Sequence, residues 1–177
     1  MNLEPIKIQD LDLNIFNQFD KRWFLLTCGD FETGKFNTMT ISWGSLGTVW
    51  DRPFAQVFVR PTRHTFEFMN QYDSFTLSAF NKTYKSSLDL LGSKSGRDSD
   101  KIADSGLTPV KSSEVKSPCF KEAELVIECR KMYWQVLDPS HFLFANIEHK
   151  YPRKDYHCVY FGEVMAVFGT KEFIHPV

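Results

Sequence analysis

The segment from residue 35 to residue 65 reads KFNTMTISWGSLGTVWDRPFAQVFVRPTRHT. Its first nine residues alternate, as in a strand whose side chains point to opposite faces with a period of two. One face carries Asn37, Met39, Ile41 and Trp43, and the other carries Phe36, Thr38, Thr40 and Ser42. Residues 44–53 predict a glycine-containing loop, and residues 54–60 predict another strand, rich in β-branched and aromatic residues. Pro61 ends that strand, and Thr62 is predicted to cap a helix over residues 63–71 with its hydroxyl.

Further strands are predicted on both sides of this segment. They cover residues 22–28, 74–80, 141–149 and 157–169, with a bulge at Gly162, and residues 121–137 form two strands or one long bent strand. Helices are predicted over residues 84–91 and 99–105, the second ended by Gly106, and residues 107–120 form a surface excursion or short edge strands. The pattern favours a mainly β fold with inserted helices, built as an antiparallel barrel.

Size and charge limit the possible functions. The chain has 177 residues, which fits a single domain over 1–177, and its formal net charge is −1. A charge so close to zero predicts no binding to nucleic acid. No apolar run reaches the roughly 18 residues of a membrane helix. The N-terminal residues lack the apolar region of a secretory signal, so a cytoplasmic location is expected.

The four cysteines, Cys28, Cys119, Cys129 and Cys158, show no CxxC spacing. That absence argues against a zinc or dithiol site, and we expect no metal. Cys28, Cys129 and Cys158 lie in strand-like sequence, which predicts small buried apolar residues in a reducing compartment.

Two loops have the composition of an anion site. Arg60, Thr62, Arg63 and Thr65 surround the predicted start of a helix, where free N–H groups favour a phosphate. Ser93, Lys94 and Arg97 lie in a glycine-containing turn that can aim backbone N–H groups at an anion. Taken alone, each loop is better explained as a solvated surface, but two in a chain of near-zero charge favour one shared phosphate.

A planar redox cofactor would also need an apolar wall and hydrogen-bonding groups. The hydroxyls of Thr38, Thr40 and Ser42 are predicted to form a row on one strand face. A solvent-facing threonine surface is the alternative reading. His157 precedes a strand and is a candidate to place a nicotinamide or protonate a reduced cofactor, although a histidine there is more often structural. No Walker loop, GxGxxG, HExxH or nucleophile elbow occurs.

These segments together resemble the flavin reductase-like family with an FMN-binding split barrel, most closely its flavoredoxin-like branch. The resemblance rests on residues 37–44 (NTMTISWG), 51–53 (DRP), 59–65 (VRPTRHT), 75–78 (FTLS), 92–98 (GSKSGRD) with Asp100-Lys101, and 161–164 (FGEV). It implies a Greek-key split barrel, a homodimer, and FMN in a groove near the subunit interface. It places Thr38, Met39, Thr40 and Ser42 at the isoalloxazine and Arg60, Thr62, Arg63 and Thr65 at the phosphate, with Ser93, Lys94 and Arg97 closing over the phosphate or ribityl chain. Asn37 and Trp43 are also expected at the cofactor site, although a tryptophan at position 43 is equally explained as a core or interface residue and not a stacking partner.

The hypothesis that follows is an FMN-dependent oxidoreductase. Electrons would pass from NAD(P)H or a redox partner protein through FMN to a second acceptor. The alternative is a flavoredoxin-type electron carrier without nicotinamide turnover. A third possibility, a barrel that has lost its cofactor, is disfavoured because Arg60, Arg63, Lys94 and Arg97 would repel one another without an anion.

Overall fold

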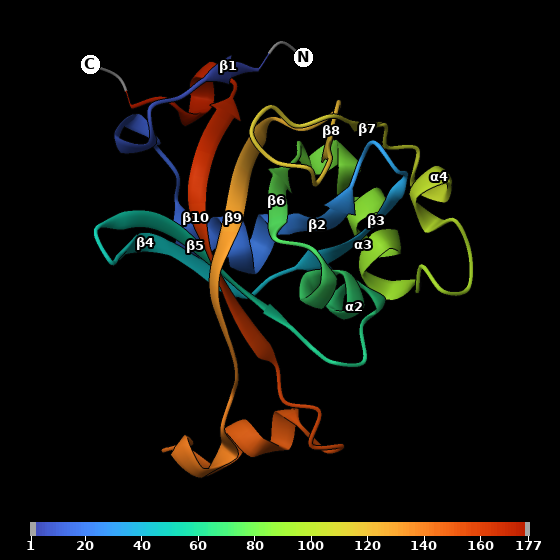
Figure 1. Cartoon of the computed structure of the whole chain (residues 1–177), viewed down its shortest axis with the longest axis vertical. Coiled ribbons are helices and arrows are strands. Elements are labelled where there is room, and N and C mark those ends of the chain that lie inside the picture. Colours follow the sequence, from blue (N-terminus) through green and yellow to red (C-terminus); the bar gives the residue numbers. More distant parts are fainter. Residues whose placement is uncertain (1–2, 176–177) are drawn as a thin grey trace.

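The fold is built on one large antiparallel sheet with helices on its outside (Figure 1). A computed structural model of the chain describes residues 3–175. The main sheet has eight strands, seven of them in the order β3-β2-β6-β9-β10-β5-β4, with β1 paired to β10. Their bounds are β1 (Glu4–Pro5), β2 (Phe24–Asp30), β3 (Lys35–Ile41), β4 (Gly44–Val49), β5 (Arg52–Val59), β6 (Ser74–Ala79), β9 (Leu125–Val136) and β10 (Cys158–Gly169). The predicted mainly β, antiparallel class is confirmed.

The two end strands of this order are close neighbours in the sequence. Only Ser42 and Trp43 separate β3 from β4. Three peptide units span at most about 11 Å, so the two ends of the sheet must approach each other. The sheet therefore curls into a barrel, but β3 and β4 do not pair in the part of the chain that is described. The barrel is split where the chain passes from β3 to β4.

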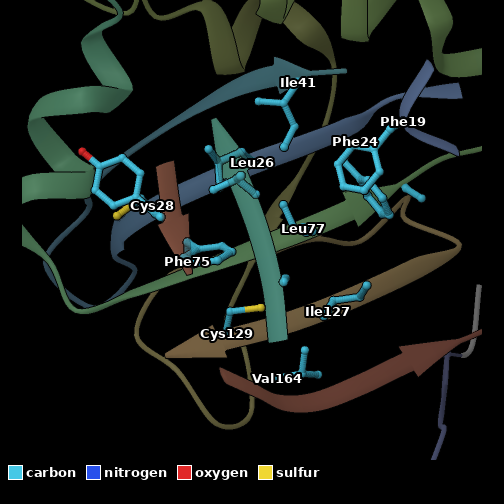
Figure 2. Packing of buried hydrophobic residues seen from close by; sticks show 14 of the residues in the cluster. Phe19, Phe24, Leu26, Cys28, Ile41, Phe75, Leu77, Ile127, Cys129 and Val164 are labelled. Carbon is cyan, nitrogen blue, oxygen red and sulfur yellow. The ribbon is translucent and has the colours of Figure 1, made fainter. Parts of the chain in front are cut away.

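The barrel interior is filled by the inward-facing residues of the strands (Figure 2). Phe24 and Leu26 from β2 meet Phe75 and Leu77 from β6 and Ile127 from β9, and all five are fully buried. Burial of a large apolar side chain contributes roughly 1.5–3 kcal/mol. This core holds the strands that carry the site described below.

A second apolar cluster covers the outside of β2, β6 and β9. It joins Leu25 and Val126 of the sheet to Leu88 and Leu91 of a helix and to Phe120. The covering elements are α3 (Lys85–Ser93), α4 (Lys101–Ser105), β7 (Pro109–Val110) and β8 (Cys119–Phe120). The helices predicted over 84–91 and 99–105 are confirmed, and the 107–120 excursion contains two short strands paired with each other.

Further short helices lie outside these layers. Helix α2 (His64–Gln71) packs on β2 and β3, with Met69 fully buried. The others are α1 (Ile15–Asn17), a π-helical turn (Gln18–Arg22) and 3₁₀ helices at Ile8–Asp10, Lys82–Tyr84, Pro139–His141, Ala145–Lys150 and Lys171–Phe173. No helix within residues 3–175 is long and apolar enough to cross a membrane.

Beyond Val136, the end of β9, the chain projects from the barrel as an arm, residues 137–157, before it returns as β10 (Figure 1). Residues 121–137 contain one long strand, one of the two predicted forms. Register with β10 shifts between Phe161 and Gly162, so a bulge lies at the predicted place, but its extra residue is Met132 on β9 and not Gly162. The strand predicted at 141–149 is wrong, because this segment forms 3₁₀ turns at the arm's end. Leu143 there is 92% exposed, so no sheet or core covers its apolar sequence.

Two further predictions need correction around β4 and β5. Residues 44–53 are not a loop but β4 and the start of β5, joined by a two-residue hairpin turn. Trp50 and Asp51 both have positive φ, as a type I′ turn requires, without the glycine that usually signals one. Helix α2 begins at His64 after Arg63, and Thr62 does not cap it.

Candidate functional site

The two predicted anion loops lie against each other. Arg63 Nη1 donates to the carbonyl of Gly92 at 3.0 Å, which joins the start of α2 to the end of α3. Arg97 Nη1 donates to the carbonyl of Thr62 at 3.3 Å. The expectation that residues 60–65 and 93–97 converge is therefore confirmed.

A cavity of about 70 Å³, here called the basic cavity, lies between these loops. Three cationic side chains line it, from Arg63, Lys94 and Lys101. The remaining lining residues are Asn37, Met39, Thr62, His64, Thr65, Ser93, Ser95 and Gly96, so no carboxylate lines the cavity within residues 3–175. A group of cations and hydroxyls at the start of a helix suits a compact anion.

Lys101 is the most unusual of these cations, and sequence reasoning did not place it in the site. It is 3% exposed, and its Nζ donates to the carbonyls of Leu91 at 2.7 Å and Lys94 at 3.0 Å. Burial, together with the charge of Arg63, lowers the Lys101 pKa to about 8. No acidic side chain pairs with it among residues 3–175. By contrast, the Lys94 ammonium lies 3.1 Å from Asp104.

Strand β3 forms one wall of the basic cavity. Asn37 Nδ2 donates to Thr65 Oγ1 at 2.8 Å, which ties the strand to the first turn of α2. Gly96 passes so close that a Cβ there would lie 2.4 Å from Asn37 Oδ1. A side chain at position 96 would force the loop or the Asn37 side chain to shift, and Asn37 is held by its bond to Thr65.

A second cavity of about 160 Å³, here called the split cavity, lies where the barrel is open between β3 and β4. It shares Met39 and Arg63 with the basic cavity, so the two adjoin. Its other lining residues are Thr40, Ile41, Ser42, Trp43, Phe58, Arg60 and His157. Apolar and aromatic walls with a few polar groups are the usual composition of a cofactor site.

The predicted row of hydroxyls on β3 is only partly available. Thr38 is fully buried, and its hydroxyl lies 2.9 Å from Thr27 Oγ1 and donates to the carbonyl of Leu26 at 3.0 Å. Thr40 donates to the carbonyl of Leu88 in α3 at 2.5 Å. Ser42 is exposed at the split. The open row is therefore wrong for Thr38, because the outer side of β3 is covered by the second apolar cluster and α3.

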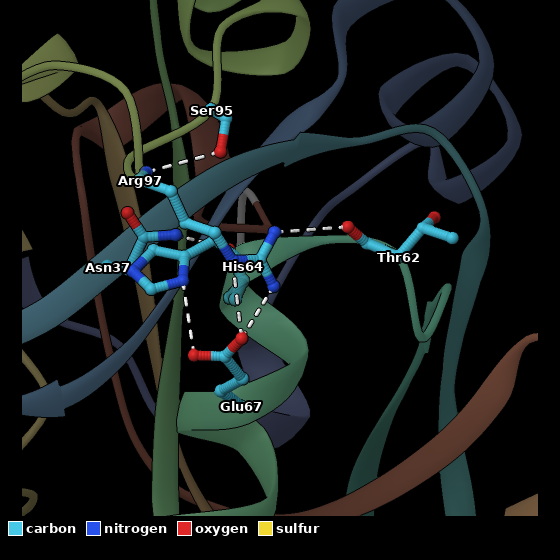
Figure 3. Close-up of polar contacts among 7 residues, drawn as sticks. Asn37, Thr62, His64, Glu67, Ser95 and Arg97 are labelled. Atoms are coloured by element: carbon cyan, nitrogen blue, oxygen red, sulfur yellow. Dashed lines mark hydrogen bonds and ion pairs between the residues drawn. The ribbon is translucent and has the colours of Figure 1, made fainter.

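Two of the predicted phosphate ligands bind carboxylates of this chain outside the basic cavity. Arg60 lines the split cavity but not the basic cavity, and its Nη1 donates to Asp155 Oδ2 at 2.9 Å. The guanidinium of Arg97 binds Glu67 Oε1 at 2.6 Å and does not line the basic cavity (Figure 3). The structure thus leaves Arg63 and Lys94 of the predicted cations at the basic cavity and adds Lys101 to them.

His157 lines the split cavity. Its ring is 4.8 Å from that of Trp43, and its Nδ1 is 2.8 Å from the hydroxyl of Tyr151. Burial, with the charges of Arg60 and Arg63, lowers its pKa to about 4 despite the opposing effect of Asp155. The imidazole is therefore neutral near pH 7.

The cysteines do not contribute to either cavity. All four are buried and free. Burial raises the pKa of the Cys28 thiol to about 12 and also raises that of Cys129. A thiol that stays protonated is a poor nucleophile, which agrees with the predicted structural role.

Comparison with known families identifies the architecture. The family described as Flavin reductase like domain matches residues 16–173. The chain belongs to this family. The match includes both cavities, from β3 through α4 to His157. Among curated proteins, none matches the chain significantly.

Solved structures of this flavin reductase-like family share the fold. Flavoredoxin of Desulfovibrio vulgaris (Miyazaki F) matches with a TM-score of 0.65 and 23% identity, covering 85% of this chain and 70% of that one. An FMN-binding domain of a flavin reductase-like enzyme from Shewanella baltica matches with a TM-score of 0.69 and 16% identity, covering 95% and 77%. Flavoredoxin from Methanosarcina acetivorans matches with a TM-score of 0.66 and 21% identity, covering 97% of this chain and 77% of that one. The predicted split-barrel fold is confirmed.

Proposed function

We propose that this flavin reductase-like protein binds FMN, with the phosphate in the basic cavity and the isoalloxazine in the split cavity, and acts as a flavin-dependent oxidoreductase. One observation carries the proposal. A cavity lined by three cations and no carboxylate within the described residues adjoins an aromatic-walled cavity at the opening of the barrel. The FMN-binding relatives of the same fold support the choice of cofactor.

The chemistry of the basic cavity fits a phosphate monoester. Such a group carries about −1.5 to −2 charges at pH 7 and offers three strong acceptor oxygens. Lys101 is a buried cation whose present partners are neutral carbonyls, and Arg63 is the cation that lowers its pKa further. A dianion would relieve that repulsion and give the buried ammonium a partner. The N–H groups at the start of α2 supply further donors.

The split cavity fits a flat aromatic ring system. Met39, Ile41, Trp43 and Phe58 give it apolar walls, and Ser42 and His157 give it polar atoms. When bound, FMN supplies the capacity to accept a hydride and release electrons. The residues of this chain bind and orient that ring, and the neutral His157 adds no charge beside it.

The electron donor is proposed to be NAD(P)H or a redox partner protein. Rapid mixing of the FMN-loaded protein with NADH or NADPH separates the two cases. Bleaching of the flavin band within seconds supports a reductase, whereas an unchanged band supports the flavoredoxin-type carrier.

The direct test is titration of the purified protein with FMN. The proposal expects one FMN per chain, a yellow protein, and affinity for riboflavin at least about tenfold weaker, since charged hydrogen bonds contribute roughly 1.5–3 kcal/mol each. Absence of FMN binding would remove the proposal.

We also propose that the protein is a homodimer. An exposed aromatic cluster supports this: the rings of Trp50 and Tyr133 are 6.0 Å apart, Tyr133 and Phe161 are 5.7 Å apart, and Trp50 is 59% exposed. Exposed aromatic patches are typical of protein interfaces. Light scattering should report twice the chain mass, and Tyr133→Asp should shift it toward the mass of one chain.

A further inference from the structure

The arm, residues 137–157 between β9 and β10, returns to the barrel at the split cavity, where Arg60 holds it. Arg60 Nη1 donates to Asp155 Oδ2 at 2.9 Å, and Nη2 donates to the carbonyl of Lys150 at 2.8 Å. Its guanidinium also lies 5.0 Å from the centre of the Tyr151 ring. One side chain at the end of β5 thereby holds the segment 150–155 beside His157.

Tyr151 is the residue of that segment that contacts the histidine. It is 4% exposed, and its hydroxyl lies 2.8 Å from His157 Nδ1. The two rings meet edge to face, with centroids 5.5 Å apart and an interplanar angle of 77°. On its other sides, the imidazole meets the rings of Trp43 at 4.8 Å and Phe58 at 6.4 Å. His157 is thus confined on three sides by aromatic rings.

The hydrogen bond to Tyr151 decides which ring nitrogen carries the proton. A neutral imidazole has one N–H and one acceptor nitrogen. If the hydroxyl accepted from Nδ1–H, its own hydrogen would need another acceptor, and the described residues supply none. If the hydroxyl donates to Nδ1, its hydrogen is used. Burial raises the pKa of Tyr151 against the opposing effects of Arg60 and the His157 backbone amide, so the hydroxyl keeps its hydrogen to donate.

Donation to Nδ1 leaves the proton of the imidazole on Nε2. None of the residues from 3 to 175 hydrogen bonds to Nε2. The two nitrogens flank Cε1 and point in widely different directions, so Nε2 does not face the Tyr151 hydroxyl. Nε2 is not among the buried polar atoms of the described residues that lack a partner, so it is accessible, and His157 lines the split cavity. We take this neutral N–H as a donor to the split cavity, where we have placed the isoalloxazine.

We propose that Tyr151 is a positioning residue, which fixes His157 as the Nε2–H tautomer and so directs a single uncharged donor at an acceptor atom of the bound redox pair. The acceptor is a carbonyl oxygen or ring nitrogen of the flavin, or the carboxamide oxygen of a nicotinamide. The inference rests on the proposed function for the identity of the acceptor. The tautomer itself rests only on the contacts of this chain.

Tyr151→Phe tests the proposal with little change of shape. The ring would still stack on Phe142, at 6.0 Å, and still meet Arg60. The matched control is Tyr156→Phe, because Tyr156 belongs to the same aromatic group, at 5.1 Å from Tyr151, but its hydroxyl donates to Glu148 at 2.9 Å and not to His157.

The first readout is the ¹⁵N spectrum of the histidine rings, without flavin, with His157→Gln used to identify the signals of His157. We expect a protonated Nε2 and an acceptor Nδ1 in the unaltered protein and in Tyr156→Phe. In Tyr151→Phe the Nδ1–H form should rise to a substantial population. A His157 already protonated on Nδ1, or an identical spectrum in Tyr151→Phe, would overturn the proposal.

The second readout locates the acceptor in the FMN-loaded protein. Loss of one neutral hydrogen bond changes an equilibrium constant by about two- to tenfold. A change of that size in FMN affinity or in the flavin potential in Tyr151→Phe places the acceptor on the flavin, and a change in KM for NADH alone places it on the nicotinamide. Unchanged values in all three would contradict the positioning role. Failure of every form to bind FMN would instead remove the proposed function, with the tautomer still decided by the first readout.

Discussion

The guanidinium of Arg97 lies 2.6 Å from the carboxylate of Glu67, and this pair joins the loop after α3 to the first turn of α2 (Figure 3). Arg97 also donates to the carbonyl of Thr62 at 3.3 Å, and His64 Nδ1 lies 3.3 Å from the other oxygen of Glu67. Both sides of the basic cavity are thus held together from outside it. Under the proposed function, this arrangement gives Arg97 an indirect role in phosphate binding.

An indirect role predicts that Glu67→Gln and Arg97→Ala have similar effects. Each removes the same exposed ion pair, and exposed pairs contribute about 0–1 kcal/mol, so FMN affinity should fall by no more than about fivefold in either variant. Calorimetric titration of both variants checks this. A much larger loss in Arg97→Ala than in Glu67→Gln would show that Arg97 contacts the phosphate itself.

The sequence predicted the strands around the core and the convergence of the two loops, since alternation and loop composition are local signals. It did not predict features that depend on contacts between distant parts of the chain. Residues 141–149 have apolar strand-like sequence, yet they lie on the arm, where no neighbouring strand pairs with them. The turn at Trp50 and Asp51 lacks the usual glycine.

The same contrast between local sequence signals and tertiary contacts applies to the site. Arg60 and Arg63 are three residues apart, and only the path of the arm shows that Arg60 turns to Asp155 while Arg63 stays at the basic cavity. Lys101 stands at the start of a short helix, where a lysine is ordinarily exposed, and it is buried only because α4 folds against α3. No local pattern marks either difference.

Lys101→Met should weaken FMN binding by about tenfold or more, because the buried cation is lost and charged hydrogen bonds contribute roughly 1.5–3 kcal/mol. Riboflavin, which lacks the phosphate, should bind both forms equally. Fluorescence quenching titrations with the two ligands measure the difference. An equal loss for riboflavin would indicate a general disturbance of the fold in place of a phosphate contact.

The same lysine predicts a pH dependence. Burial lowers the Lys101 pKa to about 8 in the free protein, and a bound phosphate favours the charged form and so raises it. Binding then takes up a proton above about pH 8, so FMN affinity should fall as pH rises through 8. Titrations between pH 7 and 9.5 check this, with Lys101→Met expected to lack the Lys101-dependent part of the slope. If FMN affinity changed with pH in the same way in both proteins, a group other than Lys101 would be responsible.

Arg60→Ala and Arg63→Ala should change the affinities for FMN and riboflavin in different ways. Arg63 lines both cavities, so its loss should weaken FMN much more than riboflavin, by about tenfold. Arg60 holds the arm, so its loss should leave the ratio of FMN to riboflavin affinity close to that of the unaltered protein. If Arg60→Ala lowered that ratio as strongly as Arg63→Ala, Arg60 would have to turn to the phosphate on binding.

Gly96→Ala should weaken FMN binding without unfolding the protein. Its Cβ would lie 2.4 Å from Asn37 Oδ1, so the loop or the Asn37 side chain must shift, and either shift changes the basic cavity. Thermal unfolding should change little, because the loop is outside both apolar clusters, while FMN affinity falls several-fold. Full affinity in this variant would show that the loop position is not needed for binding.

Calorimetric comparison of FMN and riboflavin binding decides whether one phosphate joins the two loops at the basic cavity. We expect a 1:1 complex with FMN and at least about tenfold weaker binding of riboflavin, in keeping with charged hydrogen bonds worth roughly 1.5–3 kcal/mol each. Equal affinity for the two ligands, or no binding of FMN, would show that the basic cavity holds no phosphate.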